Sequence, residues 1–349
     1  MLLYIHIPFC DSKCSYCAFN SYVDKFHLKQ KYMQALSIQL DFELKRFKTK
    51  EKSIETVFIG GGTPSTVEPE LYEELFTKLK PYLGEAIEIT SEANPNSATK
   101  EWLSGMKKLG VNRISFGVQS FDKEKLKLLN RAHSPQDAVN AIKNANELGF
   151  KNISLDLIYA TLGDTKELLH HDLQEAFKLP INHLSAYALT IEEGTVFEKK
   201  PQMSKETLET TEWFFKQIKE KFNQYEISNF GSYKSQHNLG YWNYKDYIGL
   251  GSGAVGKFKK QRFYPTTILE DYIKNPLDTR VEDLEDEDII IEKLFLGFRS
   301  DVGVQEDILT SSELKKAFIL VDEKKLNYKN GTFFNTTYLL ADEIALFIS

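Results

Sequence analysis

The 349-residue chain contains few cysteines, no long apolar run and no excess of basic residues, and each shortage excludes a class of protein. Three cysteines cannot all pair, and a chain this large does not need disulfides, so we expect a reducing compartment, the cytoplasm. No stretch approaches the roughly eighteen apolar residues of a membrane span, and we expect no removable signal at the N-terminus. The net charge of −6 argues against nucleic acid as a main partner, because phosphate binding requires clustered Lys and Arg.

The cysteines that are present, Cys10, Cys14 and Cys17, lie within eight residues of one another. Such a set is typical of a metal or cluster site, and soft sulfur ligands select zinc, copper or iron–sulfur. A structural zinc ion usually takes four ligands from widely spaced pairs, so zinc would have to recruit His6 or His27. We favour a site whose three ligands leave one metal position open over zinc and over three unrelated buried thiols.

Short β-branched runs alternate with segments of helical periodicity along the first 195 residues. This alternation of six strands with helices predicts an α/β fold with a parallel sheet. The expected strands are 2–7, 53–60, 86–92, 111–118, 152–159 and 183–189, and the expected helices are 25–47, 68–82, 99–109 and 135–148.

Three polar residues, Glu92, Gln119 and Asp156, stand within or just past the carboxyl end of an expected strand. In α/β barrels this edge of the sheet carries the chemistry. Each residue alone could be a helix cap or a turn residue, but three at comparable places favour a site.

The pattern changes near residue 200, so we expect a domain of residues 1–200 followed by a smaller α+β domain of residues 201–349. The second part is expected to hold a helix at 204–222, short aromatic strands up to residue 263, and an acidic run at 282–288. The acidic run precedes the apolar segment 289–298, and acidic residues in a first helical turn stabilise the helix dipole.

Gly60, Gly61, Gly62 and Thr63 directly follow the second expected strand. Three glycines at a strand end allow the polar groups of a ligand to reach bare backbone. A tight turn without a ligand is the alternative.

The cysteine spacing, with Tyr16 before the third cysteine, resembles the cluster loop of the radical S-adenosylmethionine (SAM) enzymes. The resemblance implies that Cys10, Cys14 and Cys17 hold a 4Fe-4S cluster whose fourth iron is chelated by the amino and carboxylate groups of SAM. It also implies a partial (βα)6 barrel of the TIM type.

The glycine turn, GGGTP at 60–64, resembles the coproporphyrinogen-oxidase-like branch of that family. Four further motifs share this resemblance: TSEANP with Glu92, RISFGVQSF with Gln119, LLNRAH with Arg131 and ISLDLIY with Asp156. The resemblance implies that Glu92 meets the ammonium group of SAM, that Arg131 meets its carboxylate, and that Gln119 and Asp156 bind its ribose. The loop after Asp156 departs from the family pattern IYGLPGQT, with Ala160 and Leu162 in place of the first glycine and the proline, which puts the adenine contacts of this loop in question. The full set of residues implied to bind the cofactor is Tyr4, Gly60, Gly61, Gly62, Thr63, Glu92, Gln119, Arg131 and Asp156.

Within this branch the sequence is similar to the HemW-type heme chaperones. The motif HNLGYW at 237–242 is typical of them, whereas the HemN-type oxidases carry a further cysteine where this chain has Phe19, and a longer N-terminal arm. Relatives often carry histidine at the position of Val255, so a heme contact at that point is expected to be missing.

The resemblance implies a chaperone that binds heme, the cluster and SAM, and that delivers heme to apo-hemoproteins such as membrane respiratory enzymes. His237 is a candidate heme ligand, because imidazole is a common axial donor, and a core cluster around His237 is the alternative. An oxygen-independent coproporphyrinogen III oxidase is the alternative function. The sequence assigns no catalytic residue and leaves a monomer and a dimer open.

Overall fold

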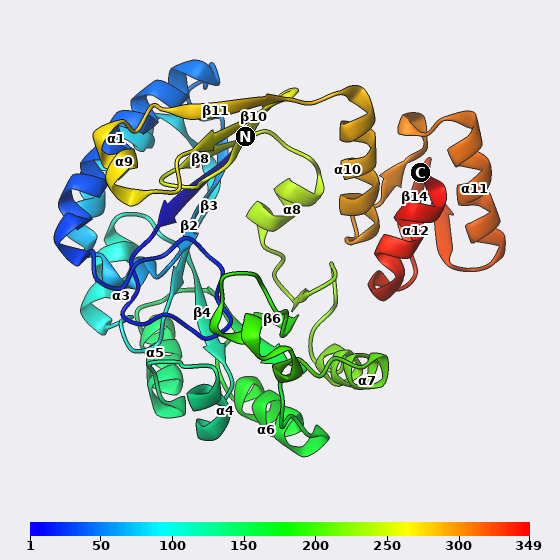
Figure 1. Cartoon of the computed structure of the whole chain (residues 1–349), viewed down its shortest axis with the longest axis horizontal. Helices are drawn as coiled ribbons and strands as arrows, with labels where there is room; N and C mark the ends of the chain where they lie inside the picture. The colour runs from blue at the N-terminus through cyan, green and yellow to red at the C-terminus, as the bar shows by residue number, and fades with distance from the viewer.

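A computed structural model describes the whole chain, residues 1–349 (Figure 1). The strands are β1 (Leu2–Ile7), β2 (Ile54–Gly61), β3 (Leu83–Ala93), β4 (Arg113–Gln119), β5 (Asn152–Tyr159), β6 (His183–Ala188), β7 (Asn229–Gly231), β8 (Tyr247–Leu250), β9 (Gly256–Phe258), β10 (Gln261–Pro265), β11 (Thr279–Asp283), β12 (Val304–Gln305), β13 (Leu326–Lys329) and β14 (Thr332–Asn335). The α-helices are α1 (Lys29–Arg46), α2 (Glu73–Leu79), α3 (Lys100–Lys108), α4 (Lys123–Leu128), α5 (Pro135–Glu147), α6 (Lys166–Phe177), α7 (Leu208–Lys219), α8 (Gln236–Trp242), α9 (Leu269–Lys274), α10 (Asp286–Phe298), α11 (Ser311–Asp322) and α12 (Ala341–Ile348).

Strands β1 to β6 lie side by side in chain order, and every neighbouring pair is parallel. Parallel neighbours require crossover connections, and the intervening helices cover the outer face of the curved sheet (Figure 1). This arrangement confirms the predicted α/β fold with a partial (βα)6 barrel. Because all six strands run the same way, their carboxyl ends meet along one edge of the sheet.

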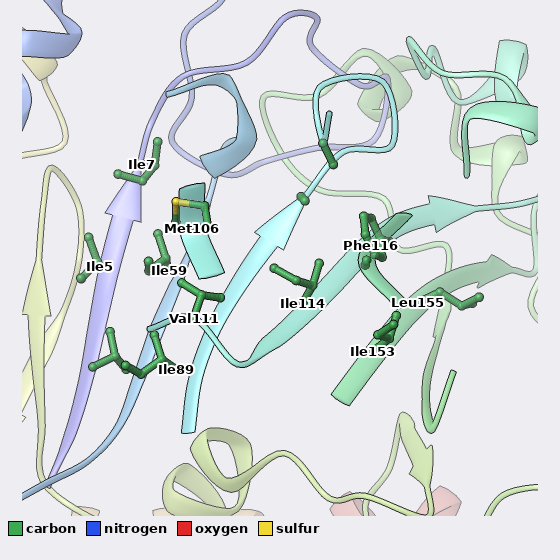
Figure 2. Packing of buried hydrophobic residues seen from close by; sticks show 14 of the residues in the cluster. Ile5, Ile7, Ile59, Ile89, Met106, Val111, Ile114, Phe116, Ile153 and Leu155 are labelled. Carbon is green, nitrogen blue, oxygen red and sulfur yellow. The ribbon is translucent and has the colours of Figure 1, made fainter. Parts of the chain in front are cut away.

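The side chains of the parallel strands separate apolar from polar faces. Ile5, Ile59, Ile114 and Leu155 point toward the helical layer, where Met106 of α3 packs with them (Figure 2). The alternate positions point to the concave face, because successive side chains of a strand point to opposite sides. Along β3 and β5 this second set is mostly polar and includes both predicted carboxylates, Glu92 and Asp156.

Segments from beyond residue 200 extend both edges of the main sheet. Strand β7 pairs antiparallel with β6, while β8 pairs parallel with β1 and continues into the antiparallel strands β9, β10 and β11. A separate core forms further along, around Leu294, Phe298 and Phe333, where α10, α11 and α12 pack with the three-stranded antiparallel sheet of β12, β13 and β14. The α+β character predicted for the C-terminal part is thus confirmed, whereas a domain boundary at residue 200 stays a prediction.

Several expected helices are shorter than the periodic segments that predicted them. The expected helix at 204–222 is α7, Leu208–Lys219, because the Thr207 side chain caps the first turn and Pro201–Met203 forms a 3-10 turn before it. The expected helix at 68–82 is α2 with a 3-10 turn at each end, and proline is the first residue of one turn, Pro69, and the second residue of the other, Pro81. Proline lacks the N–H that an α-helix interior requires, which explains both interruptions.

Candidate functional site

A cavity of about 620 Å³ opens at the carboxyl ends of the parallel strands, and we call it the first cavity. Most of the predicted cluster and SAM residues meet there, although they come from the loop after β1, from strands β2 to β5 with the turn after β2, and from the loop after α4. The predicted residues that line it are Cys10, Cys14, Cys17, Gly61, Gly62, Thr63, Glu92, Gln119, Arg131 and Asp156. Two predicted residues, Tyr4 and His237, line a different cavity.

The three thiols lie on one wall of the first cavity and are free. Burial raises the pKa of Cys10 and of Cys17, so these thiols resist ionisation until a metal binds. The Arg131 guanidinium donates to the Cys14 sulfur at 3.3 Å. No three His, Cys, Asp or Glu side chains are grouped to hold a single metal ion, whereas a 4Fe-4S cluster binds each thiolate at a separate iron. The donor set therefore fits a cluster.

The glycine turn brings backbone close to the cysteine loop. A Cβ atom on Gly62 would lie 2.9 Å from two backbone carbonyl oxygens and 3.0 Å from the Cys10 sulfur. Gly61 has a φ of +111°, a conformation that other residues rarely adopt. The turn is therefore a place of close approach, as a ligand site requires, and its last residue, Thr63, lies with its hydroxyl 3.4 Å from the Cys10 sulfur.

Glu92 and Asp156 are two of the three carboxylates that line the first cavity, and neither of these two forms an ion pair. Burial, and then the charge of Asp156, raises the pKa of Glu92 to about 8. Burial also raises the pKa of Asp156. The Glu92 carboxylate accepts a hydrogen bond from the Gly61 N–H at 3.2 Å. Two carboxylates without a basic partner favour a cationic ligand, and SAM carries both an ammonium and a sulfonium group.

Arg131 supplies positive charge at the wall of the first cavity. Its guanidinium donates to the Asn94 side-chain oxygen and to the Gly117 carbonyl, both at 2.6 Å, while its buried Nε atom has no partner. An unpaired guanidinium N–H suits a ligand carboxylate. Gln119 reaches the cavity through a left-handed backbone conformation, φ +68°, at an irregular end of β4.

Asn94 is a site residue that the sequence analysis missed. Its side chain accepts from Arg131 and donates to the Thr63 hydroxyl at 3.2 Å, so it joins the predicted carboxylate-binding residue to the glycine turn. The signal was available, because Asn94 stands two positions after Glu92 in the motif TSEANP.

The structure explains how the chain tolerates its departures in the loop after β5. Ala160 has a φ of +61°, a conformation that glycine adopts without strain. The Leu162 N–H donates to the Met203 carbonyl at 2.7 Å, a bond that proline could not form. Asp164 accepts from the Thr161 N–H and hydroxyl and pairs with the buried Lys125 at 2.9 Å. A buried ion pair therefore holds this loop.

We expect Asp164→Asn to lower the free energy of unfolding by about 3 kcal/mol, because it leaves the buried Lys125 ammonium with Asp172 alone, at 3.9 Å. Urea unfolding followed by circular dichroism measures the change. Glu209→Gln removes one partner of the exposed pair with Lys166 and is expected to change stability by less than about 0.5 kcal/mol. Equal losses in the two variants would contradict the importance of the buried pair.

A second cavity, of about 690 Å³, lies between the barrel and α10. Helix α8 stands between β2 and α10 and brings the HNLGYW motif to its wall (Figure 1). The remaining wall comes from β1 and β2, from β8, β9 and the loop between them, from β10 and from α10. Aromatic rings and basic side chains predominate among its lining residues, which include Tyr4, Phe58, Tyr241, Tyr247, Phe295, Lys245, Lys257, Arg262 and Arg299. Val255, where relatives often carry histidine, also lines it.

His237 lies at the wall of the second cavity but is only 1% exposed. Its Nδ1 atom is 2.8 Å from the Thr56 hydroxyl, and its Nε2 atom is 3.1 Å from the Tyr241 hydroxyl. Burial, assisted by the charge of Arg113, lowers the pKa of His237 to about 3, so the ring is neutral. Both ring nitrogens are engaged, as the core-cluster alternative requires, and the role as heme ligand stays a prediction.

The fold and the first cavity define a radical SAM protein. The model of the Radical SAM superfamily matches residues 4–176. The solved structure of coproporphyrinogen III oxidase (HemN) from Escherichia coli has the same fold, with a TM-score of 0.83 and 20% identity, covering 99% of this chain and 89% of that chain. Membership of the superfamily implies a 4Fe-4S cluster and SAM as cofactors.

Curated relatives define the family more narrowly. The heme chaperone HemW of Bacillus subtilis (strain 168) is 34% identical over 325 residues, which cover 87% of this chain and 84% of the relative. That of Escherichia coli (strain K12) is 40% identical over 278 residues, which cover 76% and 72%. The chain belongs to the HemW heme chaperone family. None of its twelve α-helices combines the length and apolar character that crossing a membrane requires.

Proposed function

We propose that this protein is a cytoplasmic heme chaperone that binds heme in the second cavity, holds a 4Fe-4S cluster and SAM in the first cavity, and transfers heme to apo-hemoproteins. The observation that carries the proposal is the second cavity in a chain of the HemW family. Its volume is within the range of small-molecule sites, and its lining matches a flat apolar ring that carries carboxylates.

The aromatic part of the lining provides surface for the macrocycle. Phe58 and Tyr4 form one side, with ring centroids 6.3 Å apart, and Tyr241 and Tyr247 meet edge to face at 4.8 Å. Phe295 of α10 also lines this cavity. Aromatic rings bury large apolar area and stack on other π-systems, which supports binding of a porphyrin face.

The basic part of the lining provides partners for propionates. Lys245 pairs with Glu55, and Arg299 forms two hydrogen bonds with Asp342, at 2.8 and 2.9 Å. The side chains of Lys245 and Glu55 are 43% and 51% exposed, and exposed ion pairs contribute little to stability. A propionate can therefore replace Glu55 as the partner of Lys245 at small cost.

The residues of the first cavity fit SAM and the cluster on three counts. Three free thiols share one wall, two carboxylates lack a cation, and the Arg131 Nε atom lacks an acceptor. When bound, the cluster supplies one-electron chemistry. The chain's own residues would orient the cofactor, with Glu92 toward its ammonium group, Arg131 toward its carboxylate, and Gln119 with Asp156 toward its ribose.

The experiment that tests the function is a heme titration of the anaerobically reconstituted protein, in parallel with an assay for coproporphyrinogen III decarboxylation in the presence of SAM and a reductant. We expect saturable binding of one heme per chain and no protoporphyrinogen. Many turnovers to protoporphyrinogen would instead make the protein an oxidase.

We expect Lys245→Glu to weaken heme binding at least about fivefold, because it replaces a cation of the second cavity by an anion. The Soret absorbance gives the dissociation constant. Lys143→Glu, on the exposed surface of α5, makes the same change in net charge and is expected to leave the constant unchanged. Equal weakening in both variants would show that only the net charge matters and would remove the support for this cavity.

His237→Ala tests the prediction that His237 is a heme ligand. If His237 ligates iron, the variant shifts the Soret maximum and lowers the affinity, and the hydrogen bond to Tyr241 must open in the complex. An unchanged maximum and affinity would assign His237 to the hydrogen-bonded core between β2 and α8.

A further inference from the structure

One residue of strand β1 contacts the surroundings of both cavities. His6 is 6% exposed, and both of its ring nitrogens are hydrogen-bonded. Its Nδ1 atom is 2.9 Å from the hydroxyl of Tyr4, which lines the second cavity. Its Nε2 atom is 2.8 Å from the backbone carbonyl of Asn20, three residues after Cys17 in the cluster loop.

The chemistry of these partners gives the bonds a direction. The Asn20 carbonyl only accepts, so the His6 Nε2 atom carries the proton and donates it. The Nδ1 atom of the neutral ring then accepts from the Tyr4 hydroxyl. Burial lowers the pKa of His6, which is consistent with a neutral ring. The three residues thus form a continuous chain of hydrogen bonds from the wall of the second cavity to the cluster loop.

The His6 ring also lies against the glycine turn of the first cavity. A Cβ atom on Gly61 would lie 2.5 Å from two atoms of the ring. Because the ring fills the space beside Gly61, it cannot shift without disturbing the turn that is predicted to bind SAM. Backbone movement at the turn and rotation of His6 are therefore linked by packing.

A second branch of the hydrogen-bond chain starts at the Asn20 side chain and connects the cluster loop to the loop between β8 and β9. Its Nδ2 atom donates to the Ser252 carbonyl at 3.1 Å and to the Thr267 carbonyl at 2.9 Å. Ser252 belongs to the loop between β8 and β9, whose residues Gly253 and Val255 line the second cavity. Tyr32 strengthens this branch, because its hydroxyl accepts from the Ser252 N–H at 3.1 Å and donates to the His6 carbonyl at 2.8 Å.

We propose that Tyr4, His6 and Asn20 are positioning residues that couple the two cavities, so that the protein loaded with cluster and SAM binds heme more tightly than the unloaded protein. The inference rests on the proposed heme site. Ligation of a cluster by Cys10, Cys14 and Cys17 fixes the loop that carries Asn20. Both branches then hold walls of the second cavity in place, and a preorganised cavity binds its ligand more tightly. Coupling is reciprocal, so heme must tighten SAM binding by the same factor.

The test compares the heme dissociation constant of the unloaded protein with that of the protein reconstituted with cluster and SAM. We expect the loaded wild-type protein to bind heme at least about fivefold more tightly. In Tyr4→Phe, which lacks only the hydroxyl that bonds His6, we expect the ratio to fall below about twofold. Tyr247→Phe removes a hydroxyl from the same cavity outside the hydrogen-bond chain and is expected to keep the wild-type ratio.

Asn20→Ala provides an independent variant, because it removes the side-chain bonds to the β8–β9 loop and keeps the carbonyl that accepts from His6. We expect it to lower the ratio as well, at an iron content equal to that of the wild-type protein. A purely structural role of these residues would change the melting temperature and leave the ratio intact, which would overturn the proposal.

The failure of the coupling is distinguishable from the failure of the proposed function. Equal heme affinity in the loaded and unloaded wild-type protein, or weaker binding when loaded, would overturn the coupling and leave the chaperone proposal standing. Absence of saturable heme binding in both states would overturn the heme site itself.

Discussion

Replacing Cys10, Cys14 and Cys17 together with alanine is expected to abolish the brown iron–sulfur absorbance of the reconstituted protein. These are the only cysteines of the chain, and they line one wall of the first cavity. Without them no thiolate remains to hold iron, and cluster assembly depends on thiolates. Iron and acid-labile sulfide per chain, measured after anaerobic reconstitution, give the result directly.

The cysteine variant is compared with a matched control variant, and its folding is checked. Ser12→Ala changes a residue that lines the same cavity without removing a thiol, and it is expected to retain full iron and sulfide. Circular dichroism shows whether the cysteine variant remains folded. Full iron and sulfide in the folded triple variant would disprove the cluster site.

Changing Glu92 to Gln is expected to have two opposite effects. The variant should lose at least about tenfold in SAM affinity, because a neutral amide cannot offset the ammonium charge. At pH 8 the ligand-free variant should be more stable than the wild-type protein, by ~2 kcal/mol, because the pKa of Glu92 is raised to about 8 and each pKa unit corresponds to about 1.4 kcal/mol. The gain in stability is smaller than the whole pKa shift would give, because Glu92 is partly exposed to the cavity.

The sign of the pH dependence follows from the raised pKa of Glu92. In the unfolded chain this carboxyl ionises near its ordinary value, whereas in the folded, ligand-free protein it keeps its proton up to about pH 8. Wild-type stability is therefore lost as the pH rises between these values, and the stabilising effect of Gln should be larger at pH 8 than at pH 5. SAM affinity of the wild-type protein should fall below about pH 8, because binding then requires release of a proton.

Unfolding at several pH values and equilibrium dialysis of SAM measure the two effects. The amino group of SAM also titrates, and it does so equally with both proteins. The contribution of Glu92 is therefore the difference between the pH dependence of SAM affinity in the wild-type protein and that in the Gln variant. Glu124→Gln, exposed on α4, is expected to change neither quantity. A variant that binds SAM normally would remove Glu92 from the site, and a destabilised variant would show that its carboxylate stabilises the fold.

Most of the barrel was predictable because its signals are local. Each βα unit shows an apolar run and then a helical period, and this order requires a parallel sheet. The placement of Glu92, Gln119 and Asp156 in one cavity also followed from a local feature, their position at strand ends, since all parallel strands end at the same edge. Helix ends were less predictable where a proline interrupts the period, as at Pro69.

The amino-acid sequence by itself determined the parallel α/β fold and the grouping of the three cysteines with Glu92, Gln119 and Asp156, because spacing along the chain and strand order are enough to bring these residues to one edge. Only the tertiary structure decided the second cavity, which joins Tyr4 to Arg299 across almost the whole chain, and the two hydrogen bonds that engage His237. It also decided the hydrogen bonds of His6, which join Tyr4 at the wall of the second cavity to the Asn20 carbonyl in the cluster loop. These features depend on how β8 and α10 pack against β1 and α8, and contacts between residues hundreds of positions apart leave no periodic pattern in a single sequence.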